Sequence, residues 1–181
     1  MGSMLQSRAA PENCNHTAGS NDEAAKDITS TNILNETLGL NLQLLDHHVW
    51  VGSVFGTYPL TINRGATRGI TTRGKPSGDP AGSKVAVVYA GSNVEDGSNN
   101  CAWLVAWHVP ADGSTSSKVY VEAGDISKYS GKIDWDEVES KLDASSDQIY
   151  YMDDYTRSIA SAAIVLDVIT KIKVLFDVAK K

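Results

Sequence analysis

The clearest pattern in the chain runs from Gly82 to Pro110, where two apolar segments flank a polar loop. The first segment, Val85–Tyr89, is rich in β-branched residues and too short for a helix. The second segment carries large side chains at alternate positions, Trp103 and Trp107 among them. Because strand side chains alternate between two faces, both indoles point to the same side. The pattern predicts two paired strands that are buried on at least one face.

Shorter segments of the same kind lie on both sides of this pair, separated by recurrent glycines. They predict one or two strands around Gly39 within Ile33–Leu45, and further strands at His47–Val51, Pro59–Asn63, Arg68–Thr72, Lys118–Ala123 and Ile149–Tyr151. Lys118–Ala123 alternates cleanly, and we expect it to form a hairpin with the strand that carries the tryptophans.

Two segments towards the C-terminus have apolar residues at helical spacing. Ile133–Leu142 has acidic residues early and Lys141 late, which predicts one short amphipathic helix. Ile164–Ala179 fits a helical stripe as well as strands. Its many β-branched residues favour strands, and we expect them at about Ile159–Leu166 and Lys171–Val178.

Many short strands with frequent glycine turns predict an all-β fold, an antiparallel β-sandwich with one short amphipathic helix. Residues 1–30 are polar and lack periodicity, and we interpret them as a disordered, mobile N-terminal tail. We expect residues 31–181 to form a single sandwich domain. Residues 1–30 also lack the apolar segment of a signal peptide, and no apolar run is long enough for a transmembrane segment. We therefore expect a cytoplasmic protein.

The charge of the chain limits its partners. Its formal net charge is -6, so there is no basic field for a phosphate backbone, and we expect no nucleic-acid partner. One local cationic cluster lies in a glycine-rich segment and is either a solvated loop or a contact for an anion or lipid headgroup: Arg64, Arg68, Arg73 and Lys75. Cys14 and Cys101 lie in unlike surroundings, which argues against a disulfide framework.

The sequence contains no motif that would carry catalysis or bind a metal ion. His-x-x-x-His and Cys-x-x-Cys spacings, a Gly-x-Ser-x-Gly elbow and a phosphate-binding loop are all missing. Cys101 and His108 lie on one predicted strand, roughly 23 Å apart and on opposite faces, so they cannot form a catalytic pair. The acidic groups at Asp134–Glu137 and Asp153–Asp154 are either paired carboxylates or a cation site, or a helix start and a solvated loop. The helix start and the loop are the simpler explanation. We expect no enzymatic activity, no cofactor and no metal site.

Aromatic side chains are the remaining candidates for ligand binding. Trp103 and Trp107 either fill the core, which their place on a central strand favours, or contact a sugar ring or lipid interface. Trp50 and Tyr120 are candidates to extend such a surface. We take these four residues as the candidate ligand-binding set, with a carbohydrate or a lipid headgroup as the ligand.

Four motifs in a fixed order carry a family resemblance across Asn32–Phe176. They are Gly-Ser-Lys-x-Ala-Val-Val-Tyr (Gly82–Tyr89), Cys-x-Trp-Leu-x-Ala-Trp (Cys101–Trp107), Lys-Val-Tyr-Val-Glu (Lys118–Glu122) and Asp-Trp-Asp (Asp134–Asp136). In this order they resemble the plant jasmonate-induced proteins of the 23-kilodalton type. The resemblance implies a compact β-sandwich and an intracellular protein that accumulates after jasmonate, salt or drought, without established catalytic residues. The first motif is also similar, more weakly, to a strand of aegerolysin-type β-sandwiches.

The leading functional hypothesis is therefore a noncatalytic plant protein of stress or defence that acts through binding. The alternative is a membrane-active, aegerolysin-like defence protein, in which the C-terminal apolar segment or an aromatic patch engages bilayers. A defence enzyme directed at ribosomes is disfavoured by the acidic net charge and by the missing catalytic residues.

Overall fold

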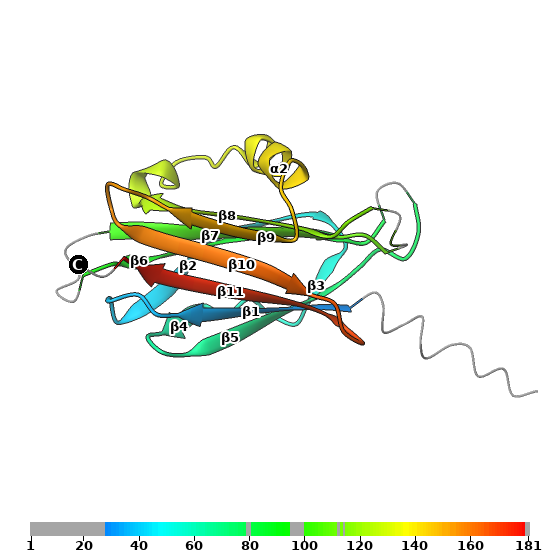
Figure 1. Cartoon of the computed structure of the whole chain (residues 1–181), viewed down its shortest axis with the longest axis horizontal. Helices are drawn as coiled ribbons and strands as arrows, with labels where there is room; N and C mark the ends of the chain where they lie inside the picture. Colours follow the sequence, from blue (N-terminus) through cyan, green and yellow to red (C-terminus); the bar gives the residue numbers. More distant parts are fainter. Residues whose placement is uncertain (1–27, 79–80, 95–99, 112, 114, 180–181) are drawn as a thin grey trace, which may run out of the picture.

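Two β-sheets packed face to face make up the computed structural model, which describes residues 28–78, 81–94, 100–111, 113 and 115–179 (Figure 1). The six-stranded sheet has the order β3-β5-β1-β11-β10-β9, and the five-stranded sheet has the order β4-β2-β6-β7-β8. The strands are β1 (Ile28–Asn35), β2 (Asn41–Val51), β3 (Ser53–Phe55), β4 (Thr61–Asn63), β5 (Thr67–Arg73), β6 (Ser83–Ser92), β7 (Asn100–Val109), β8 (Lys118–Asp125), β9 (Gln148–Met152), β10 (Ser158–Val165) and β11 (Thr170–Val178). The predicted all-β sandwich is confirmed.

The paired strands predicted between Gly82 and Pro110 are β6 and β7, which run antiparallel with Tyr89 opposite Trp103. The predicted hairpin partner is β8, where Ala123 lies opposite Trp103. Of the two alternatives for the C-terminal segment, the strands are confirmed as β10 and β11, which pair with each other. Residues 1–27 of the predicted tail lie outside the described residues, while residues 28–30 begin β1.

One pair of strands departs from the predicted antiparallel arrangement. β1 and β11 are parallel neighbours in the middle of the six-stranded sheet, with Ile33 opposite Val174. A hairpin forces two strands to run antiparallel, but no hairpin connects the first strand to the last one. β1 and β11 could therefore pair in parallel or antiparallel, and the local sequence pattern does not indicate which of the two occurs.

The main core lies between the two sheets. Trp103 and Trp107 are 0% exposed there, and the ring of Trp103 lies 6.3 Å from that of Phe176 on β11. The other face of β7 is buried as well, because Ala102, Leu104 and Ala106 belong to a second core on the outer side of the five-stranded sheet. Such double burial is unusual for an antiparallel sheet, which commonly leaves one face to water.

The second core is closed by the helix α2 (Trp135–Asp143), which lies over the five-stranded sheet in Figure 1, and by the 3₁₀ turn η1 (Ile126–Lys128). Val138 and Leu142 are the buried residues of α2. Below the helix, the buried Lys84 of β6 pairs with Glu139 and Asp143, at 2.7 Å in each case. The predicted amphipathic helix is thus confirmed. No described helix lies over the outer face of the six-stranded sheet.

Replacing Trp103 with alanine is expected to lower the free energy of unfolding by about 3–5 kcal/mol, because a fully buried indole leaves a cavity between the sheets. The half-buried Trp50, at the margin of the second core, provides a matched control, and Trp50→Ala should cost clearly less. Urea unfolding followed by circular dichroism measures both. Equal losses for the two variants would contradict the assigned core.

Candidate functional site

The four predicted ligand-binding residues occupy two different places. Trp103 and Trp107 face the main core and expose no ring surface to solvent. Trp50 on β2 and Tyr120 on β8 are partly buried and pack against the second core. The structure therefore does not bring the four side chains together on one surface.

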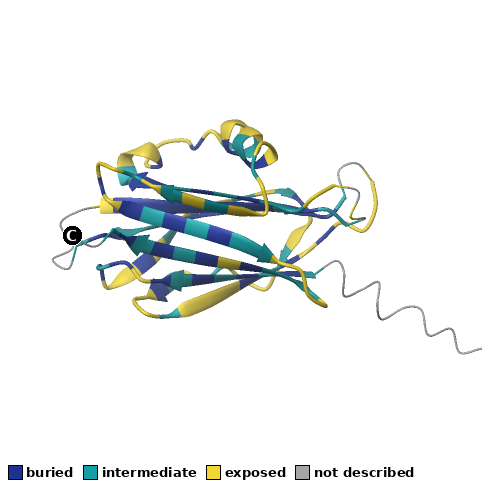
Figure 2. Cartoon of the chain, viewed as in Figure 1, coloured by how far each residue is buried: buried dark blue, intermediate teal, exposed yellow. Residues whose placement is uncertain are grey.

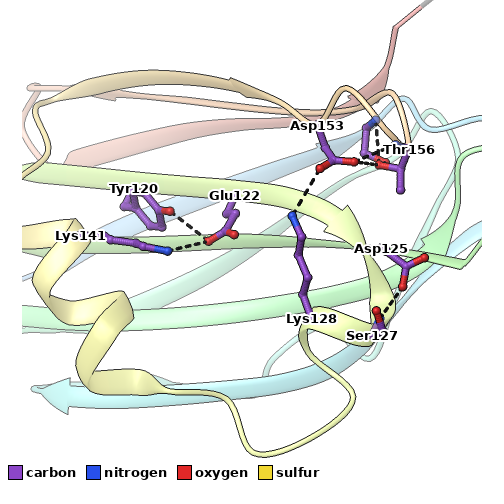
Figure 3. Close-up of polar contacts among 9 residues, drawn as sticks. Tyr120, Glu122, Asp125, Ser127, Lys128, Lys141, Asp153 and Thr156 are labelled. Carbon is purple, nitrogen blue, oxygen red and sulfur yellow. Dashed lines mark hydrogen bonds and ion pairs between the residues drawn. The ribbon is translucent and has the colours of Figure 1, made fainter.

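Trp50 belongs to a small aromatic group at the margin of α2. The His48 ring stacks on the Trp135 indole with centroids 5.2 Å apart, and Trp50 meets both rings edge-on. Tyr120 donates a hydrogen bond to Glu122 at 3.0 Å, and Lys141 of α2 pairs with the same carboxylate at 3.6 Å (Figure 3). These contacts fix α2 to the sheet, so they account for both aromatic residues structurally.

The acidic groups noted in the sequence have structural partners too. Asp134 caps α2 by accepting a hydrogen bond from the Glu137 amide at 3.0 Å. Asp153 accepts two hydrogen bonds from Thr156, both at 2.7 Å, and pairs with Lys128 at 3.3 Å (Figure 3). Burial alone would raise the pKa of Asp153, but the bonds from Thr156 and Lys128 outweigh it and lower this pKa. Within the described ranges, no three His, Cys, Asp or Glu side chains are grouped so as to hold a metal ion.

Cys101 and His108 lie on opposite faces of β7, as the alternation predicted. The Cys101 side chain belongs to the main core. Burial raises the pKa of its thiol, which keeps the sulfur protonated and unreactive. Cys101 thus acts as a small buried residue of the main core.

The cationic cluster of the sequence is spread out rather than focused on one point. Arg68 and Arg73 both lie on β5, roughly 16 Å apart along the strand. The Arg73 guanidinium lies over the Phe55 ring at 5.8 Å, and Arg64 donates to the carbonyl of Leu38 at 3.4 Å. This geometry does not form a common anion site.

A cleft of about 970 Å³ opens at the end of the sandwich where β10 runs into β11. We call it the end cleft. One wall is the loop between β7 and β8, and the opposite wall is the β10–β11 turn. Its lining is rich in hydroxyl groups, with Thr115, Ser116, Ser117, Ser145, Ser146 and Thr170. Lys118, Asp147 and Asp167 are its charged lining residues. Side chains of this kind bind polar or anionic groups by hydrogen bonds.

The β10–β11 turn exposes two large apolar side chains at the edge of the end cleft. Leu166 is 76% exposed and Val168 is 79% exposed. Between them, Asp167 accepts a hydrogen bond from the Val168 amide at 2.8 Å and pairs with Lys171 at 2.7 Å. These bonds lower the pKa of Asp167, the one from Lys171 most of all, and hold the turn in shape. The turn thus presents apolar surface next to a polar cleft.

None of the four predicted ligand-binding residues lies in the end cleft. One signal for it was present, because Leu166-Asp167-Val168 puts apolar residues into a hairpin turn where polar ones are usual. No local sequence pattern marks the cleft, since its walls come from three separate parts of the chain.

In the part of the chain that the structure describes, no helix is long and apolar enough to cross a membrane.

Comparison with known proteins identifies relatives of this fold and sequence. A family model described as "Nakanori-like protein" matches residues 21–172. A jasmonate-induced protein homolog of Atriplex canescens is 32% identical over 143 residues, covering 77% of this chain and 74% of that protein. A 23 kDa jasmonate-induced protein of Hordeum vulgare is 34% identical over 116 residues, which cover 63% of this chain and only 53% of that relative. The predicted resemblance to jasmonate-induced proteins is confirmed.

A solved structure shares the architecture at low sequence identity. The crystal structure of the lipid binding protein Nakanori matches with a TM-score of 0.68 at 17% identity, over 83% of this chain and 71% of that one. At this identity the likeness shows a common fold. It leaves the ligand of the present chain to be argued from the chain's own surface.

Acidification is expected to weaken the fold through His108, which precedes the cleft residue Val109. The Nε2 atom of His108 is buried without a hydrogen-bond partner, and its pKa is lowered from 6.5 by burial and then by the charge of Lys84. A lowered pKa means that the unfolded chain binds the proton more readily. The stability that His108 contributes is therefore complete above about pH 6.5 and is lost as the pH falls below it.

Urea unfolding at pH 7.5 and pH 5.5 tests this expectation. The wild type should lose more stability between the two pH values than the His108→Gln variant, which has no titrating group at this position. An equal loss in both proteins would show that His108 does not contribute.

Proposed function

The chain belongs to the Nakanori-like family, and from this premise we propose that it is a noncatalytic protein that binds lipid surfaces through the end cleft. We further propose that it does so as a stress- or defence-responsive protein of the plant cytoplasm, in keeping with its jasmonate-induced relatives. Nakanori, whose solved structure shares this fold, is a lipid binding protein. The observation that carries the proposal is the pair Leu166 and Val168, exposed at the edge of a hydroxyl-lined cleft.

The apolar turn alone would give weak attachment. Transfer of a Leu or Val side chain from water to an apolar medium yields about 1.5–3 kcal/mol. Two of them together reach about 3–6 kcal/mol, which is near the roughly 4 kcal/mol of a millimolar complex. Stable peripheral binding takes a second signal besides one apolar insertion. The end cleft provides that signal if it holds the headgroup of the lipid whose chains surround the turn.

The side of the cleft that carries Lys118 suits the phosphate of a headgroup. Lys118 hydrogen-bonds the main-chain carbonyl of Asp143 and forms no ion pair with any residue that the structure describes. Among the described residues, no carboxylate neutralises its positive charge at contact distance. The hydroxyls of the loop between β7 and β8 lie on the same wall and donate to anionic oxygens without a charge of their own.

The contacts of the cleft hydroxyls support binding without catalysis. Ser145 donates to the carbonyl of Leu142 at 2.7 Å, and Ser146 donates to the carbonyl of Gln148 at 2.8 Å. A nucleophilic serine donates instead to a general base, which removes its proton. Both hydroxyls thus have the partners of structural groups.

Co-sedimentation with liposomes tests the proposal. We expect the wild type to sediment with vesicles of phosphatidylcholine and phosphatidylserine. The double variant Leu166→Ser, Val168→Ser should bind at least about tenfold more weakly, because the apolar transfer free energy is lost. Circular dichroism should be unchanged, since both side chains are exposed.

The opposite end of the sandwich provides a matched control. Leu40 is 79% exposed and Tyr155 is 88% exposed there, so Leu40→Ser, Tyr155→Ser removes a similar apolar surface. This control should sediment like the wild type. Equal losses in the two double variants, or no recruitment of the wild type by any lipid mixture, would overturn the proposal.

A further inference from the structure

The six-stranded sheet has a hollow in its outer face, the side turned away from the core. The hollow has a volume of about 770 Å³, within the range of small-molecule sites, and shares no lining residue with the end cleft. Its lining residues come from β1, β5, β9, β10 and β11. Along β1, β10 and β11, buried residues alternate with less buried ones (Figure 2). We call it the sheet hollow.

Register explains why the sheet is hollow at this point. Two neighbouring rows of outward side chains cross the five strands. One row is Tyr150, Ser161, Leu175, Leu34 and Thr67, and the other is Gln148, Ala163, Lys173, Asn32 and Gly69. On β10 both outward positions carry small side chains, Ser161 and Ala163. The larger side chains on β9 and β11 therefore stand above a depressed floor.

The two rows differ in chemistry. The first has an aromatic ring at the edge strand and leucine side chains on β11 and β1. The second carries the amides of Gln148 and Asn32 on either side of the ammonium of Lys173. Apolar surface along one side and hydrogen-bonding groups along the other match the two aspects of a sugar ring, whose C–H face is apolar and whose rim is polar.

Lys173 gives the sheet hollow a positive charge that favours an anionic ligand. Its neighbour on the same face, Lys171, is paired with Asp167 at 2.7 Å. Lys173 is exposed and forms no ion pair with a described residue, although it lines the hollow. A single cation in a chain of net charge -6 does not hold a polyanionic backbone, but it can hold one carboxylate.

We propose that the sheet hollow is a second binding site and that it takes an acidic sugar, a pyranose bearing a carboxylate. The C–H face of the ring packs over Ser161, between the side chains of Tyr150 and Leu175. The amides of Asn32 and Gln148 bond its hydroxyls, and Lys173 pairs with its carboxylate. The hollow is open, so a uronic acid residue within a longer glycan also fits. This site goes beyond the proposed lipid attachment and does not depend on it.

Titration calorimetry with a uronic acid trisaccharide, beside a neutral trisaccharide of the same linkage, tests the proposal. We expect the wild type to bind the acidic sugar and to bind the neutral one at least tenfold more weakly. Lys173→Gln should remove this preference, and Tyr150→Ala should weaken both sugars. Amide chemical shifts should move at β9, β10 and β11 when the acidic sugar is added.

Two control variants test whether the effects are specific to the sheet hollow. Lys171→Gln removes the adjacent, paired lysine and should leave the preference intact. The Leu166→Ser, Val168→Ser variant should bind the sugar like the wild type even if it no longer binds vesicles. The proposal is overturned if the wild type does not bind the acidic sugar, if Lys171→Gln and Lys173→Gln have the same effect, or if shifts appear only at the end cleft.

Discussion

The double burial of β7 is the constraint on which the rest of the structure depends. Trp103 and Trp107 fill the space between the sheets, while Ala102, Leu104 and Ala106 need cover on the other side. α2 provides that cover, and the buried Lys84 holds it there through Glu139 and Asp143. One outer face of the sandwich is thereby closed, and the described residues leave the outer face of the six-stranded sheet free.

Because the described residues cover only one outer face, the residues that stabilise the fold differ from those that we propose for binding. The aromatic residues that first suggest a ligand site are packing residues: Trp103 and Trp107 fill the core between the sheets, and Trp50 and Tyr120 pack against the second core. The surfaces that we propose for binding lie elsewhere: at one end of the sandwich, where Leu166 and Val168 flank a polar cleft, and on the open sheet around Lys173. Trp103 and Trp107 line neither surface, so the outward side chains there can change without removing the packing of the tryptophans.

Much of the fold could be predicted from the sequence, because period-two alternation is a local signal. It identified β6, β7 and β8 and the opposite facing of Cys101 and His108. The parallel pairing of β1 with β11 had no such signal, since it joins the two ends of the domain. The end cleft was equally hidden, because the loop before Lys118, the hydroxyls of Ser145 and Ser146 and the β10–β11 turn meet only in space. The apolar pattern also could not tell that Leu166 and Val168 point to solvent.

The central claim, that the β10–β11 turn enters the lipid surface, is tested most directly by a fluorophore placed on the turn. In a Cys14→Ser background, where Cys101 is buried, Val168→Cys can be labelled with an environment-sensitive dye, and Tyr155→Cys marks the opposite end. We expect vesicles to shift the emission to the blue at position 168 and to leave it unchanged at position 155. A blue shift at 155 with none at 168 would contradict it.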